Sequence, residues 1–145
     1  MLFRSVKVQI MAKDSLFKPP FKRFIQWLGG IPIDRSSRHG VVQQSVNALN
    51  NSEQMFLGLS PEGTRNNAPT WRSGFYAIAH EAQVPILVTV IDYSKKEIRF
   101  AGTFTPSGDF EQDLPKILAL YKGAQGCRPA LMSQPLKALS KTTQE

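Results

Sequence analysis

Six consecutive residues, Ser60 to Arg65, carry the sharpest chemical pattern in the chain: Ser-Pro-Glu-Gly-Thr-Arg. They follow an apolar run that predicts a buried strand, and open α/β sheets bind ligands at the carboxyl ends of their strands. Gly63 lets the backbone approach a ligand closely, and Thr64 offers a hydroxyl. Arg65 offers a planar fork of donors that suits a phosphate or carboxylate, and Glu62 would orient that fork or cap the loop. The pattern predicts an anion site; a plain turn with a solvated Arg–Glu pair is the alternative.

A second arginine, Arg35, also follows a predicted strand, in the run Gly30-Ile31-Pro32-Ile33-Asp34-Arg35. Two arginines that leave two strand ends would converge on one anion, so we expect Arg35 and Arg65 to share a ligand. Taken alone, Asp34 and Arg35 would form an exposed ion pair that contributes little to stability.

The charge of the chain favours anionic partners. The formal net charge is +7, from 18 basic and 11 acidic residues, and most of the excess lies in residues 1–35. Phosphorylated substrates, anionic lipid headgroups and nucleic acid all fit such an excess, as does a merely soluble basic surface. The interleaved aromatic and basic strand pattern of a single-strand binding face is missing, so we expect no nucleic-acid partner.

Composition excludes several classes of protein. A single cysteine, Cys127, excludes an internal disulfide framework and a multi-cysteine zinc site, and with only two histidines in the chain we expect no metal and no cofactor. The longest stretch without Asp, Glu, Lys or Arg, residues 39–52, is too polar to span a bilayer. Arg4, Lys7 and Lys13 interrupt every candidate signal peptide. These features predict a soluble, cytoplasmic chain.

The order of apolar patterns predicts an α/β fold. Strands are expected over residues 6–10, 31–33, 54–59, 84–93 and 97–104, and helices over residues 15–28, 41–49, 73–82 and 109–121. The run 84–93 is typical of a central strand, with 97–104 as its hairpin partner. Residues 1–125 would form one domain, and residues 126–145 a loosely held tail. Because the first strand begins almost at residue 1, we expect an upstream element to be missing.

The helix expected from Phe17 to Leu28 has two interpretations. Its apolar residues recur at three- and four-residue spacing, which predicts packing on the sheet. Lys22 and Arg23 lie beside Phe24 and other aromatic residues, a mixture that suits an anionic lipid surface. The second interpretation would place the chain peripherally on the inner face of the membrane.

Three ordered motifs together resemble the glycerolipid acyltransferase family. Ser60 to Arg65 looks like its Phe-Pro-Glu-Gly-Thr-Arg motif, with Ser60 in place of the common Phe. The run from Gly30 to Arg35 looks like its Gly-x-x-x-x-Arg motif, and Val84-Pro85-Ile86 looks like its late Val-Pro-Ile motif. The resemblance extends from about residue 12 to residue 93 and weakens towards residue 121.

The resemblance implies a glycerol-3-phosphate acyltransferase-like fold, a layered α-β-α sandwich with a mixed, mostly parallel sheet. It also implies transfer of a fatty acyl group from acyl-CoA or acyl carrier protein to a lysophospholipid or glycerol-phosphate hydroxyl in phospholipid synthesis. The residues implied to bind the acceptor phosphate are Arg35, Glu62, Gly63, Thr64 and Arg65. Those implied to support the site are Gly30, Pro61 and Pro85.

The general base of that family, a histidine followed five positions later by aspartate, has no counterpart here. It should precede the segment at Lys13, but His39 is followed at that spacing by Gln44, and His80 by Pro85. We therefore expect an N-terminally truncated domain with no catalytic residue of its own, inactive alone. A non-catalytic remnant that binds phosphate or lipid headgroups is the alternative.

Overall fold

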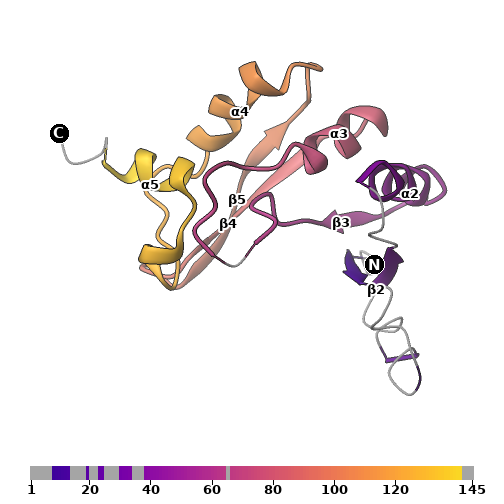
Figure 1. Ribbon diagram of the computed structural model, residues 1–145, viewed down its shortest axis with the longest axis horizontal. Helices are drawn as coiled ribbons and strands as arrows, with labels where there is room; N and C mark the ends of the chain where they lie inside the picture. Colours follow the sequence, from indigo (N-terminus) through magenta and orange to yellow (C-terminus); the bar gives the residue numbers. More distant parts are fainter. Residues whose placement is uncertain are drawn as a thin grey trace, which may run out of the picture. The chain divides into compact units, whose positions relative to one another are not determined.

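The computed structural model describes residues 8–13, 19, 23–24, 30–33, 38–64 and 66–141. The chain divides into two compact units, Met1–Leu59 and Ser60–Glu145, and each is described by itself. Figure 1 labels the helices and strands along the chain. Apart from residues 19, 23 and 24, the helix predicted from Phe17 to Leu28 lies outside the described residues, so neither of its two interpretations is tested.

The first unit contains a three-stranded parallel sheet in the order β2-β1-β3. Its strands are β1 (Val8–Lys13), β2 (Gly30–Ile33) and β3 (Phe56–Gly58). Parallel strands cannot be joined by a tight turn, and the helix α2 (Arg38–Asn50) makes the crossover between β2 and β3. The strand predicted over residues 6–10 is therefore confirmed, with a boundary that is shifted towards the carboxyl end.

The second unit is built on an antiparallel hairpin of β4 (Ile86–Asp92) and β5 (Glu97–Phe104). The helices α3 (Gly74–Glu81) and α4 (Phe110–Ala119) lie alongside this hairpin in Figure 1. One face of the hairpin packs into the core, whose buried residues are Trp71, Tyr76, Val88, Val90 and Ile117. The predicted hairpin and both helices are confirmed.

A buried carboxylate joins α3, α4 and the loop between β5 and α4. Asp113 Oδ2 accepts hydrogen bonds from Tyr76 Oη at 2.7 Å, from the Ser107 backbone N–H at 2.8 Å and from Ser107 Oγ at 2.7 Å. Lys116 Nζ lies 3.0 Å from Asp113 Oδ1. These donors, the Ser107 N–H first, hold the pKa of Asp113 well below its ordinary value. At neutral pH the carboxylate is therefore ionised and satisfied.

A second buried carboxylate, Asp92, shapes the turn of the hairpin. Its Oδ1 accepts from Ser94 Oγ at 2.6 Å and from the Ser94 backbone N–H at 2.9 Å. The Ser94 hydroxyl is the main cause that lowers the pKa of Asp92. Lys96 then takes a positive φ of 54°, which reverses the chain into β5.

Residues 126–145 were predicted to be a loosely held tail, and within this segment the structure describes regular elements that hydrogen-bond to the rest of the second unit. The segment contains the 3₁₀ turn η2 (Pro129–Leu131) and the helix α5 (Gln134–Lys141). Trp71 Nε1 donates to the buried Ser133 Oγ at 3.0 Å, and the Gln134 backbone N–H donates to the Ala68 carbonyl at 2.8 Å. Composition did not reveal these contacts because they join residues about 60 positions apart.

Two expectations about strands need correction. β3 was predicted to be buried, but Phe56 is 48% exposed. The run 84–93 was predicted to be a central strand, but within the described residues β4 pairs only with β5. Hydrophobicity alone does not show which neighbours a strand acquires. The α/β class is confirmed, and the layered sandwich with a mostly parallel sheet stays a prediction.

Candidate functional site

The loop of the Ser-Pro-Glu-Gly-Thr-Arg motif begins with a tight turn. The Gly63 backbone N–H donates to the Ser60 carbonyl at 3.3 Å, and Gly63 has a φ of +65°, which favours glycine. Thr64 Oγ1 then accepts from the Asn66 backbone N–H at 3.2 Å, while Thr64 itself is exposed. The glycine expected to permit close backbone approach is thus required by the turn itself.

Arg72, which the sequence interpretation did not single out, lies against this turn. A Cβ on Gly63 would meet Arg72 Cδ at 2.8 Å and Arg72 Nε at 2.9 Å. The Arg72 backbone N–H donates to the Pro61 carbonyl at 3.0 Å, which closes the loop on itself. A cation therefore lies beside the motif, and no local sequence pattern would have revealed it because the contact depends on loop closure.

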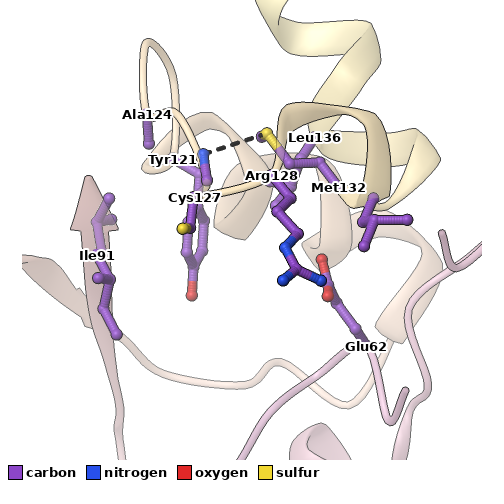
Figure 2. Close-up of a pocket in the computed structure, with 11 residues that line it drawn as sticks. Glu62, Ile91, Tyr121, Ala124, Cys127, Arg128, Met132 and Leu136 are labelled. Atoms are coloured by element: carbon purple, nitrogen blue, oxygen red, sulfur yellow. Dashed lines mark hydrogen bonds between the residues drawn. The ribbon is translucent and has the colours of Figure 1, made fainter. Parts of the chain in front are cut away.

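Glu62 of the motif loop lines a cavity of about 360 Å³. It is lined mainly by apolar side chains from β4, the end of α4 and the carboxyl-terminal segment, and the polar groups at its edge are Glu62, Tyr121, Cys127 and Arg128. In Figure 2 the Glu62 carboxylate and the Arg128 guanidinium point toward one another. The Gly126 backbone N–H to Met132 Sδ contact, at 3.3 Å, holds the loop that carries Cys127 and Arg128.

Glu62 acts electrostatically on this cavity. Burial raises the pKa of the Tyr121 hydroxyl, and the negative charge of Glu62 raises it further. Tyr121 therefore stays protonated at neutral pH and can donate a hydrogen bond into the cavity. Of the two roles predicted for Glu62, orientation of Arg65 is not tested, because Arg65 lies outside the described residues.

The remaining predicted site residues are placed as follows. Gly30 is the first residue of β2 in the first unit, Pro61 is half-buried in the motif turn, and Pro85 is exposed just before β4. Arg35, like Arg65, lies outside the described residues, so convergence of the two arginines stays a prediction. Pro61, Glu62, Gly63 and Thr64 lie together because they are consecutive in the sequence, and the structure adds Arg72 beside them.

The two histidines lie on different helices. His39 is the second residue of α2. His80 lies in the last turn of α3, where its ring stacks on Tyr76 with centroids 6.4 Å apart and faces Gly108 rather than the motif turn. Cys127 is a free, exposed thiol at the cavity edge.

Within residues 38–64 and 66–141 and the shorter described segments, no group of His, Cys, Asp and Glu side chains could hold a metal ion. Across the same part of the chain, no helix is long and apolar enough to cross a membrane.

Comparison with known proteins identifies the class. A family model described as "Acyltransferase" matches residues 1–92, which is more than half of the 145-residue chain. The chain belongs to this acyltransferase family, as the three motifs predicted. No curated protein matches, and no solved structure matches. The match ends at the last residue of β4, so most of the cavity wall beside Glu62 comes from the segment that follows it.

Proposed function

We propose that this acyltransferase domain binds the phosphate of a lysophospholipid or glycerol-phosphate acceptor at the loop after β3, as part of phospholipid synthesis. The observation that carries the proposal is the motif turn, in which Gly63 has a positive φ and Arg72 lies against it, within the region that matches the family. Arg65 and Arg35 supply the remaining cations. The layered α-β-α sandwich and a cytoplasmic location, peripheral on the membrane, belong to the same proposal.

In the reaction, the acceptor hydroxyl attacks the thioester carbonyl of acyl-CoA or acyl carrier protein. A general base takes the hydroxyl proton, and the thiol leaves as the new ester forms. Residues of this chain would hold the acceptor phosphate, because arginine binds phosphate with two parallel N–H donors. No histidine of the chain is followed five positions later by aspartate, so we propose that the chain alone does not perform the proton transfer.

Calorimetry with glycerol-3-phosphate and lysophosphatidate tests the phosphate site. A hydrogen bond to a charged group contributes about 1.5–3 kcal/mol, so Arg65→Ala or Arg35→Ala should weaken binding about ten- to a hundredfold. Arg65→Lys should restore part of it, since lysine keeps the charge but loses the planar fork. Lys122→Ala, which removes the same charge from an exposed position after α4, is the control. Unchanged affinity in both alanine variants would refute the phosphate site.

The second candidate is a non-catalytic protein that binds phosphate or lipid headgroups, and the absent His-x₄-Asp pair favours it. An assay with acyl-CoA and with acyl carrier protein against lysophosphatidate separates the two. We expect no turnover by this chain alone, since a positioned general base contributes about 10²–10⁴ in rate. Turnover that is lost in His39→Ala or His80→Ala would contradict this expectation and identify a substitute base.

A further inference from the structure

The outer face of the β4–β5 hairpin carries an exposed apolar surface. Ile91 is 56% exposed, Tyr93 56%, Ile98 68% and Phe100 72%. Ile91 lies opposite Ile98 in the strand register, and Phe100 lies opposite Thr89, so these side chains share one face. We call Ile91, Tyr93, Ile98 and Phe100 the outer apolar face; Ile91, at its edge, also lines the cavity beside Glu62. Large exposed apolar side chains that share one face of a sheet are candidates for an interaction site.

The turn at the end of the same hairpin is basic. Lys95 and Lys96 are exposed, and among the described residues neither forms an ion pair. The nearby acids do not neutralise them: Asp92 is buried against Ser94, and Glu97 lies 4.0 Å from Arg99 Nε. Asp92 also fixes the turn, because Ser94 and Lys95 backbone N–H groups both donate to it. The cations are therefore held at the edge of the outer apolar face.

We propose that the outer apolar face and the Lys95–Lys96 turn dock on an anionic lipid bilayer. Apolar and aromatic side chains would enter the boundary between headgroups and acyl chains, while the two lysines contact anionic headgroups. The positive charge of Lys95 and Lys96 favours a lipid surface over a protein partner. Lysines are depleted in the cores of protein–protein interfaces, whereas they are attracted to anionic lipid. This inference rests on the proposed function, because a domain that acts on a lysophospholipid must reach an acceptor that lies in a membrane.

Sedimentation with sucrose-loaded vesicles tests the proposal. The purified chain is mixed with vesicles of phosphatidylcholine containing phosphatidylglycerol, and with vesicles of phosphatidylcholine alone. We expect preferential binding to the anionic vesicles that weakens as salt rises. Lys95→Glu plus Lys96→Glu should reduce it at least tenfold, and Lys122→Glu, at another exposed lysine, should reduce it less.

A second pair of variants tests the contribution of the apolar side chains to vesicle binding. Ile98→Ser plus Phe100→Ser should reduce binding about tenfold or more, whereas Phe56→Ser, which removes an exposed phenyl ring of the first unit, should leave it unchanged. Each variant is first shown to be folded by circular dichroism. If the serine variants unfold, the lysine variants, whose side chains are exposed, still decide the outcome. The vesicles hold no lysophospholipid or acyl donor, so Arg65→Ala should bind them normally and failure of the phosphate site stays distinguishable.

Three results would overturn the proposal. The first is no binding of the wild-type chain to anionic vesicles. The second is equal binding by the hairpin variants and their controls. The third is a concentration-dependent dimer, seen by sedimentation velocity, that Ile98→Ser plus Phe100→Ser dissociates, because the outer apolar face would then be an interface between two copies.

Discussion

On one face of the β4–β5 hairpin Val88 and Val90 are buried, whereas on the other Ile98 and Phe100 are exposed. Both faces carry apolar residues in the same two strands, so residue type does not explain the difference. The inner face is covered by Trp71, by Tyr76 of α3 and by Ile117 of α4. Burial of the inner face stabilises the second unit, whereas the apolar side chains of the outer face are exposed.

The largest expected difference is between matched isoleucine substitutions on the two sides. Ile117→Ala should lower the free energy of unfolding by about 2–5 kcal/mol, because it leaves a cavity in a packed core. Ile98→Ala, at an exposed position, should change it by at most about 0.5 kcal/mol. Urea denaturation of both variants measures the difference. Equal losses would mean that the outer face is also covered in the folded protein.

The next largest effect on the free energy of unfolding is expected from the buried hydrogen bond between Trp71 and Ser133. Ser133→Ala removes the acceptor of the buried Trp71 Nε1–H, so it should lower the free energy of unfolding by about 1–3 kcal/mol. Ser73→Ala is the control, since Ser73 is exposed and its side chain makes no capping hydrogen bond to α3. Urea titration at neutral pH compares them. A loss no larger than that of the control would mean that the carboxyl-terminal segment does not stabilise the core.

The motif turn at Gly63 belongs to neither face of the hairpin, and we expect its substitution to lower the free energy of unfolding by a smaller amount. Gly63→Ala should cost about 1–2 kcal/mol, because φ is +65° and the new Cβ would force the Arg72 side chain to move. Gly74→Ala is the matched control, since a Cβ at Gly74 would meet nothing within 4 Å. Thermal unfolding of the two variants, and of Gly63→Ala plus Arg72→Ala, separates backbone strain from the clash. Equal stability of the two glycine variants would contradict the left-handed turn.

The last difference concerns the acid sensitivity of stability, because the contribution of Asp113 is present at neutral pH and is lost in acid. Its pKa is lowered in the folded state, so its contribution to stability is complete above the unfolded value of about 3.9 and is lost as pH falls below it. The melting temperature of the wild type should therefore fall below about pH 4. In Asp113→Asn the decline should be shallower, because the substituted amide does not titrate. Identical acid slopes would contradict the lowered pKa.

Much of the second unit could be predicted from local patterns. The alternation in residues 97–104 and the β-branched run 84–93 were enough to predict the hairpin, and Asp109 at the start of α4 is the N-cap, accepting from the Gln112 N–H at 3.1 Å. Such patterns are local, so neighbouring residues suffice to predict them. The motif loop was predicted for the same reason, since its turn depends on Gly63.

Contacts between distant residues could not be predicted. Arg72 beside Gly63, Ser133 beneath Trp71 and the cavity wall opposite Glu62 all depend on how separate segments pack. The composition of the carboxyl-terminal segment predicts a tail, because it does not show that Trp71 donates a hydrogen bond to Ser133.

The order of apolar patterns and the three motifs were therefore enough to predict the α/β class, the acyltransferase family and a loop around Gly63. Tertiary structure decided which face of the β4–β5 hairpin is covered and which stays exposed. The physical reason is that local propensity depends on neighbours along the chain, whereas burial depends on which distant side chains fill the space above a strand.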